Sequence, residues 1–207
     1  MEITKESLLK NRFISENMEG TTFHFHTHIL YDIRTSLGEG IKKYLEIGSF
    51  AGCSVSLISS HPFSTECYTI DLGTPISPDI VNRNVEKFKN KNSSHKYFQG
   101  SSSNPQIIQI VKDEVINVDL LFIDGGHLYD EVITDFNNYS DMVVSGGYIC
   151  FDDYLDHKYS PQVKPAVDDL VKILDPNDYV IIGTPSYDFI SEFSDLTSNN
   201  IFIIQKK

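Results

Sequence analysis

Short apolar runs alternate with longer amphipathic stretches over most of the chain. The apolar runs predict buried strands, and the stretches between them predict helices, an order typical of an α/β sheet with crossover helices on both faces. The predicted strands are Tyr44–Ile47, Cys67–Ile70, Lys96–Gln99, Val118–Asp124, Gly147–Asp153, Tyr179–Ile182 and Ile201–Ile204. The predicted helices are one opening at Val55–Ile58, then Ile80–Asn90, Pro105–Val115, Tyr129–Val144 and Gln162–Leu174.

These elements predict one doubly wound α/β domain over residues 41–207, with a mostly parallel sheet of about seven strands. The last two strands are expected to form a hairpin at the sheet edge. Residues 1–40 lie outside the alternation, and we expect helical segments there that pack over the crevice as a lid.

Three acids follow two of the apolar strands. Asp124 ends one strand, and Asp152 and Asp153 end the next. Because adjacent parallel strands deliver their carboxyl ends to one crevice, these three side chains are expected to converge. Carboxylates held that close repel each other unless they are protonated or neutralised, and a divalent ion such as Mg²⁺ is the usual neutraliser. We therefore predict a metal site formed by the three aspartates.

A glycine-containing turn follows the first strand, in the segment from Glu46 to Ser54. Gly48 and Gly52 let the backbone turn sharply and approach a ligand. A third glycine in the GxGxxG pattern is absent, so the turn suits a cofactor without bridging phosphates. Asp71 ends the next strand, where an acid can accept hydrogen bonds from ribose hydroxyls. The alternatives are a plain strand-to-helix turn and an Asp71 that caps a turn.

The composition of the chain indicates which binding partners and which cellular compartment to expect. The chain has 29 acidic and 17 basic residues, a formal charge of -12, which argues against nucleic acid as the main partner. Its three cysteines show no CxxC spacing and fit free thiols in a reducing compartment. With no leader and no long apolar stretch, we expect a soluble cytoplasmic protein without membrane contact.

The motifs together resemble those of class I S-adenosylmethionine-dependent methyltransferases, most closely the metal-dependent O-methyltransferases, including those that modify macrolide sugars. The resemblance covers residues 40–207 and implies a seven-stranded Rossmann-like sheet with one antiparallel strand near its C-terminus. The matching segments are Glu46–Ser54, Tyr68–Asp71, Phe122–Tyr129 and Ser145–Tyr154.

The resemblance also implies roles for individual residues. Asp124, Asp152 and Asp153 match the metal ligands, with Asp124 also beside the cofactor. One departure is Gly126, where some relatives have an acid, which puts the usual ligand set in doubt. The residues implied to bind the cofactor are Glu46, Gly48, Ser49, Phe50, Gly52, Ser54, Asp71, Ser101 and Asp124.

His127, three residues after Asp124, is the predicted general base. An imidazole titrates near neutral pH, and this one would lie close to the metal. The metal and Asp124 would hold the acceptor hydroxyl as an oxyanion in line with the sulfonium methyl group. The alternative is that His127 caps the next helix or orients Asp124.

Three further histidines, His24, His26 and His28, alternate along the chain. In an extended segment all three would share one face, a geometry that can bind zinc. A half-buried strand gives the same alternation, so we expect a lid or substrate-facing segment instead.

The predicted function is S-adenosylmethionine-dependent and Mg²⁺-dependent O-methylation of a small-molecule hydroxyl. Sugars or glycosides are the first acceptor class and catechol-like phenols the second. The alternatives are a metal-independent small-molecule methyltransferase and a non-catalytic cofactor-binding module of the same fold. A homo-oligomer is an alternative to a monomer, and no heptad pattern indicates one.

Overall fold

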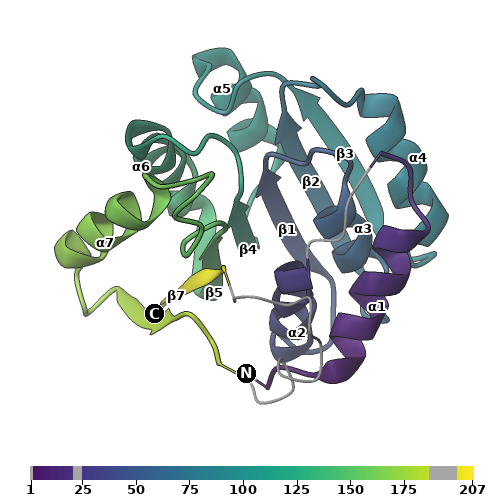
Figure 1. Cartoon of the computed structure of the whole chain (residues 1–207), viewed down its shortest axis with the longest axis horizontal. Coiled ribbons are helices and arrows are strands. Elements are labelled where there is room, and N and C mark those ends of the chain that lie inside the picture. The colour runs from purple at the N-terminus through teal and green to yellow at the C-terminus, as the bar shows by residue number, and fades with distance from the viewer. Residues whose placement is uncertain (1, 21–24, 187–199) are drawn as a thin grey trace.

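A seven-stranded sheet runs through the middle of the molecule (Figure 1). In this computed structural model residues 2–20, 25–186 and 200–207 are described. The strands lie in the order β3-β2-β1-β4-β5-β7-β6. The strands are β1 (Lys42–Ile47), β2 (Thr65–Asp71), β3 (Ser94–Gln99), β4 (Val118–Ile123), β5 (Val143–Phe151), β6 (Tyr179–Gly183) and β7 (Phe202–Lys206).

Strands β1 to β5 pair in parallel, and β7 pairs antiparallel with both β5 and β6. The predicted fold class is therefore confirmed, including the single antiparallel strand near the C-terminus. The predicted terminal hairpin exists as the β6–β7 pair, but β7 lies inside the sheet and β6 forms its edge.

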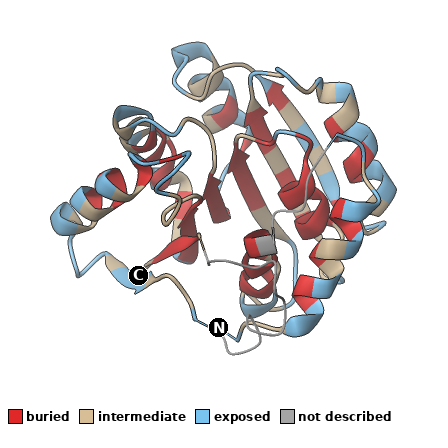
Figure 2. Ribbon diagram, in the orientation of Figure 1, coloured by how far each residue is buried: buried red, intermediate tan, exposed pale blue. Residues whose placement is uncertain are grey.

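Helices cover both faces of the sheet, and two buried clusters fill the space between. Successive strand residues point to opposite faces, so Leu45 and Leu121 join one cluster while Tyr44 and Phe122 join the other. Figure 2 shows the buried residues concentrated along the strands and on the helix surfaces that face them. The helices are α1 (Lys5–Glu16), α2 (His28–Ser36), α3 (Cys53–Ser59), α4 (Pro78–Phe88), α5 (Pro105–Glu114), α6 (Tyr129–Tyr139) and α7 (Val163–Ile173), with two 3-10 turns η1 (Phe25–Thr27) and η2 (Ser140–Met142).

The N-terminal segment contains α1 and α2, which contact each other and α3. Asp32 of α2 joins them, since its carboxylate accepts hydrogen bonds from Thr4 Oγ1 at 2.8 Å and Ser7 Oγ at 2.6 Å. The turn η1 reaches the carboxyl ends of the strands through His26, which contacts Asp152, and through Thr27. The division at residue 40 and the lid role stay predictions.

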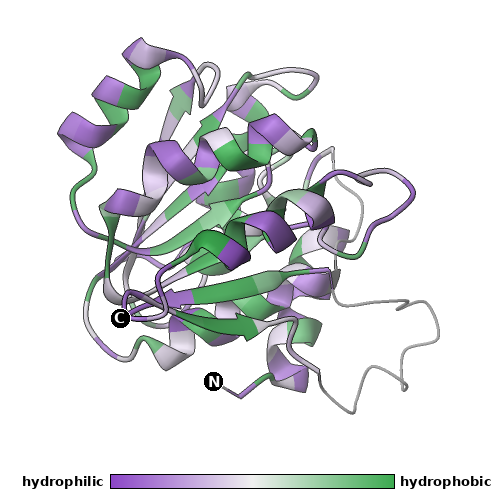
Figure 3. Cartoon of the chain, turned by 90° about the vertical axis from the view of Figure 1, so that its left-hand side faces the viewer, coloured by the Kyte–Doolittle hydropathy of each residue, from purple (hydrophilic) through white to green (hydrophobic). Residues whose placement is uncertain are grey.

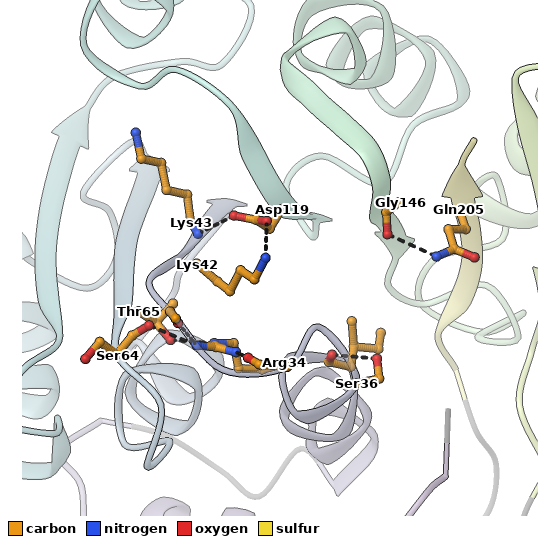
Figure 4. Close-up of polar contacts among 12 residues, drawn as sticks. Arg34, Ser36, Lys42, Lys43, Ser64, Thr65, Asp119, Gly146 and Gln205 are labelled. Carbon is orange, nitrogen blue, oxygen red and sulfur yellow. Dashed lines mark hydrogen bonds and ion pairs between the residues drawn. The ribbon is translucent and has the colours of Figure 1, made fainter.

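Polar groups close the opposite end of the sheet, where β1, β2 and β4 begin (Figure 4). The Arg34 guanidinium, 1% exposed, donates to Thr65 Oγ1 and to the carbonyls of Gly38, Gly40 and Ser64. Asp119 accepts from the backbone of Lys43 at 2.8 Å and pairs with the Lys42 ammonium at 3.2 Å. This end is thus held by matched donors and acceptors.

The predicted boundary between the helix that begins at Tyr129 and the strand after it is wrong. The helix expected over Tyr129–Val144 ends at Tyr139 and is followed by η2, and β5 already begins at Val143. Gly146 and Gly147, which come just after the predicted helix, both lie within β5. The register between β4 and β5 shifts at this place, so the extra residues form an irregularity in the strand.

The hydropathy of the residues agrees with the arrangement of a central sheet covered by helices. Figure 3 shows hydrophobic residues along the strands and hydrophilic residues on the outward surfaces of the helices. Among the described residues, none of the helices combines the length and the apolar character needed to cross a bilayer.

Candidate active site

A cavity of about 770 Å³ opens at the carboxyl ends of β1, β2, β4 and β5. Strand order reverses between β1 and β4, and ligands in open α/β sheets bind beside such a switch point. The sequence-predicted site residues that line the cavity are Gly48, Ser49, Phe50, Ser54, Asp71, Ser101, Asp124, His127, Asp152 and Asp153. Glu46 and Gly52 do not line it; they support the turn from behind.

The glycine turn between β1 and α3 is packed against two other loops. Gly48 has φ +82°, and a Cβ there would overlap the carbonyl of Asp124. Gly52 has the same φ, and a Cβ there would lie 2.9 Å from Val81 of α4. Both positions therefore require glycine, and the turn lies directly beside the strand end that bears Asp124.

Asp71 holds the glycine turn. Its Oδ2 accepts hydrogen bonds from the backbone N–H groups of Ser49 at 2.8 Å and Phe50 at 3.3 Å. Its Oδ1 accepts from Gly73 N at 2.7 Å and from the Tyr97 hydroxyl at 3.1 Å. The carboxylate at the end of β2 thus sets the shape of the turn and faces the cavity from the same position.

Glu46 lies under the turn and is fully buried. The Ser54 hydroxyl donates to its Oε1. Burial raises the pKa of Glu46 to about 8, although the hydrogen bond from Ser54 lowers it in part. The carboxyl group is therefore largely neutral at pH 7 and joins β1 to α3.

The three aspartates occupy one end of the cavity. Burial raises the pKa of Asp124 well above its ordinary value, and the neighbouring Asp152 and Asp153 raise it further. Burial and Asp152 also raise the pKa of Asp153, against the lowering effects of Ser160 and His127. The structure therefore brings these carboxyl groups close enough to interact strongly.

A metal-binding arrangement is a stricter condition than proximity. Among the described residues no group of three or more histidine, cysteine or acidic side chains is arranged to hold a metal ion. The donors are carboxylate oxygens, which are the right type for Mg²⁺. The donor chemistry thus fits a hard cation, whereas the side-chain positions do not form a ready ligand set.

Asp153 instead joins a small network with His127 and Ser160. The Ser160 hydroxyl donates to Asp153 Oδ2 at 2.6 Å, and its oxygen lies 2.9 Å from His127 Nδ1. A hydroxyl has one proton, so Nδ1 is the donor in the second contact and Nε2 carries the free lone pair. Nε2 lies 3.4 Å from Asp153 Oδ2. Ser160 was not predicted from the sequence.

His26, which the sequence placed in a lid or substrate-facing segment, contacts the carboxylate of Asp152. Its Nε2 lies 2.9 Å from Oδ1 and 3.1 Å from Oδ2 of Asp152. Although burial lowers the pKa of His26, the Asp152 carboxylate outweighs that effect and raises it. The His triplet is not a strand face, because His26 lies in η1 and His28 opens α2; His24 lies outside the described residues.

Comparison with known proteins assigns the family. Residues 45–154 match the methyltransferase-domain family. The chain belongs to this family. It is also 38% identical over 171 residues to an uncharacterised protein of Acanthamoeba polyphaga mimivirus, covering 82% of this chain and 77% of that protein.

Two solved structures show the same fold at low identity. The MycE methyltransferase of the mycinamycin biosynthetic pathway, in complex with Mg and SAH, has a TM-score of 0.62 at 15% identity and covers 99% of this chain and 55% of MycE. An rRNA methylase from Streptococcus thermophilus has a TM-score of 0.62 at 10% identity and covers 90% and 99% of the two chains. The predicted enzyme class, an S-adenosylmethionine-dependent methyltransferase, is confirmed.

Proposed function

We propose that this methyltransferase transfers the methyl group of S-adenosylmethionine to a hydroxyl of a small neutral molecule, with a sugar or glycoside favoured over a catechol-like phenol. The observation that carries the proposal is one cavity that is lined both by the Asp71-bound glycine turn and by His127 and Asp153. One side of this cavity suits a nucleoside cofactor, and the other suits removal of a proton.

On the cofactor side, Asp71 would accept the ribose hydroxyls, and the turn at Gly48 to Phe50 would contact the methionine part. A sulfonium donor is cationic, so the carboxyl groups at the other end of the cavity favour its charge. Methyl transfer is one displacement in which the oxyanion and the sulfonium lose their charges together. Positioning and electrostatics therefore supply most of the rate.

On the acceptor side, His127 Nε2 would take the hydroxyl proton. Asp153 lies beside that nitrogen and would stabilise the imidazolium, and Ser160 holds the ring in the tautomer that leaves Nε2 free. The side chain is 44% exposed, which leaves room for an acceptor to approach. This is the role predicted for His127, now with two partners that orient it.

Metal dependence is the finer part of the proposal. Asp124, Asp152 and Asp153 would hold the ion, and it would lower the pKa of the acceptor hydroxyl. The strong mutual effect of the three carboxyl groups supports a cation there, because a positive charge relieves their repulsion. Loss of activity in EDTA and its return with Mg²⁺ would support the ion; full activity in chelator would contradict it and favour the metal-independent alternative.

The charge of the cavity favours a small molecule over nucleic acid. Among the described lining residues there is no lysine or arginine, and a phosphate backbone needs such cations. The acidic lining residues are Asp71, Asp124, Asp130, Glu131, Asp135, Asp152 and Asp153. An rRNA fragment that accepts labelled methyl groups better than any glycoside or catechol would contradict this acceptor class.

Two measurements test the function. Calorimetry with S-adenosylhomocysteine should show binding, and its absence would favour a module that has lost the cofactor. The change His127→Ala should lower turnover by about 100-fold while leaving cofactor affinity within about twofold. His157→Ala is the matched control, since that histidine is exposed and does not line the cavity. Unchanged turnover in the His127 variant would remove it from the base role.

A further inference from the structure

Asp135 of α6 is a cavity-lining carboxyl group to which the proposed reaction gives no task. It is 2% exposed, and a Cβ added at Gly125 would lie 3.2 Å from its Oδ2, so the two residues are in contact. Burial raises the pKa of Asp135 to about 6, partly offset by a hydrogen bond with Ser102. At pH 7 it is therefore mostly a carboxylate, buried at the wall of a ligand cavity.

The wall around Asp135 is fixed by α6. The Tyr139 hydroxyl donates to the carbonyl of Ser102 at 2.8 Å, and Asn138 Nδ2 donates to the same oxygen at 3.5 Å. These contacts hold the loop after β3, Gly100 to Asn104, against the helix that carries Asp135. Figure 1 shows this loop and α6 at the end of the sheet where β1 and β4 finish.

The cavity that Asp135 lines carries groups that suit a flat purine ring. Ile47, Ile70 and Leu72 contribute apolar lining, and Ser101 to Ser103 contribute hydroxyl groups. If the ribose lies at Asp71 and the sulfonium near Asp124, the space that remains for the base lies between the Ser101–Ser103 loop and Gly125. This step rests on the proposed cofactor.

We propose that Asp135 selects the base of the cofactor by accepting a hydrogen bond from the exocyclic amino group of adenine. A 6-oxo purine would place an oxygen lone pair against the same carboxylate, and that unmatched pair would weaken binding. Asp135 is thus a specificity residue for the nucleoside, acting at a distance from the methyl group.

The test compares two nucleosides that differ at this edge of the purine, where the 6-oxo compound has an oxygen in place of the amino group and a hydrogen on N1. Calorimetry gives the dissociation constants of S-adenosylhomocysteine and S-inosylhomocysteine for the wild type, Asp135→Asn and Asp130→Asn. The wild type should prefer the adenine compound by about tenfold or more, since a hydrogen bond to a charged group is lost. Asp135→Asn should reduce the preference to about threefold or less, because an amide can also donate to the 6-oxo group.

The control variant is Asp130→Asn, which removes one carboxylate from the exposed rim of the same cavity and should keep the wild-type preference for the adenine compound. Equal binding of both nucleosides by the wild type overturns the inference without any variant, even if Asp135→Asn does not fold. A folded Asp135→Asn that keeps the full preference also overturns it. If the wild type binds neither compound, the proposed cofactor itself fails.

Discussion

At the amino ends of the strands the buried Arg34 guanidinium donates to Thr65 and to three backbone carbonyls, whereas at the carboxyl ends Asp124 and Asp152 place two acids against each other. The first end pairs each charge with groups of opposite polarity. The second gathers like charges beside a cavity.

The buried polar groups at the amino ends of the strands therefore stabilise the fold, whereas those at the carboxyl ends lower its stability. Hydrogen bonds to a buried cation contribute favourably, and removing the cation leaves carbonyls without donors. Carboxyl groups that raise each other's pKa oppose folding at neutral pH. A group that opposes folding is a candidate for function, because a ligand can supply what the protein alone does not.

The largest effect is expected from Arg34→Met. It leaves several buried acceptors without a donor and should lower the free energy of unfolding by about 3–5 kcal/mol, measured by urea denaturation. Lys42→Met, at the partly exposed pair with Asp119, should cost less than about 1 kcal/mol. Equal losses in the two variants would contradict the distinction between the buried network and the surface pair.

Glu46→Gln should change how stability depends on pH. The folded-state pKa of about 8 exceeds the unfolded value near 4.5, so the folded protein retains a proton that the unfolded chain loses. Wild-type stability should therefore fall as the pH rises from about 4.5 to about 8, by a few kcal/mol from this group. Urea denaturation at pH 5, 6.5 and 8 should show a flatter profile for the variant. Parallel profiles would mean that Glu46 is ionised in the folded state.

Asp124→Asn should separate activity from stability. The amide removes one of the interacting carboxyl groups, so the melting temperature should stay the same or rise. Methyl transfer should fall by roughly 100-fold, because an amide replaces a carboxyl group that would lie beside the reacting atoms. A lower melting temperature with unchanged turnover would place Asp124 with the structural groups of the opposite end.

Ser160→Ala should give the smallest of these effects. Loss of its hydroxyl frees the His127 ring and should lower kcat by about tenfold, with the KM for the cofactor unchanged. Ser160→Thr keeps the hydroxyl and should recover most of the rate. A change in KM without a change in kcat would show that Ser160 supports binding instead.

The strands and the cavity were predictable because their signals are local. Apolar runs located all seven strands. Asp71 is the last residue of β2, and the acids at 124, 152 and 153 come just after the ends of β4 and β5. Parallel pairing then brings those ends to one edge, so their presence in one cavity follows from topology alone.

The partners of these residues were not predictable, because the contacts join distant segments. His26 and Asp152 are 126 residues apart, and Ser160 and His127 are 33 apart. Nothing in the spacing of the three histidines distinguishes His26 from its neighbours. Asp135 was missed for another reason, since an acid on an amphipathic helix is ordinary until the loop that covers it is known.

The position of β7 has a consequence for biosynthesis. This strand is the last of the seven along the chain, yet it lies between β5 and β6 and pairs with both. Until Phe202–Lys206 has left the ribosome, β5 presents an open edge beside the acids that follow it, and β6 has no neighbour in the sheet. Nascent chains that stop before residue 202 should therefore depend on chaperones, and methyl transfer should begin only after this strand is in place.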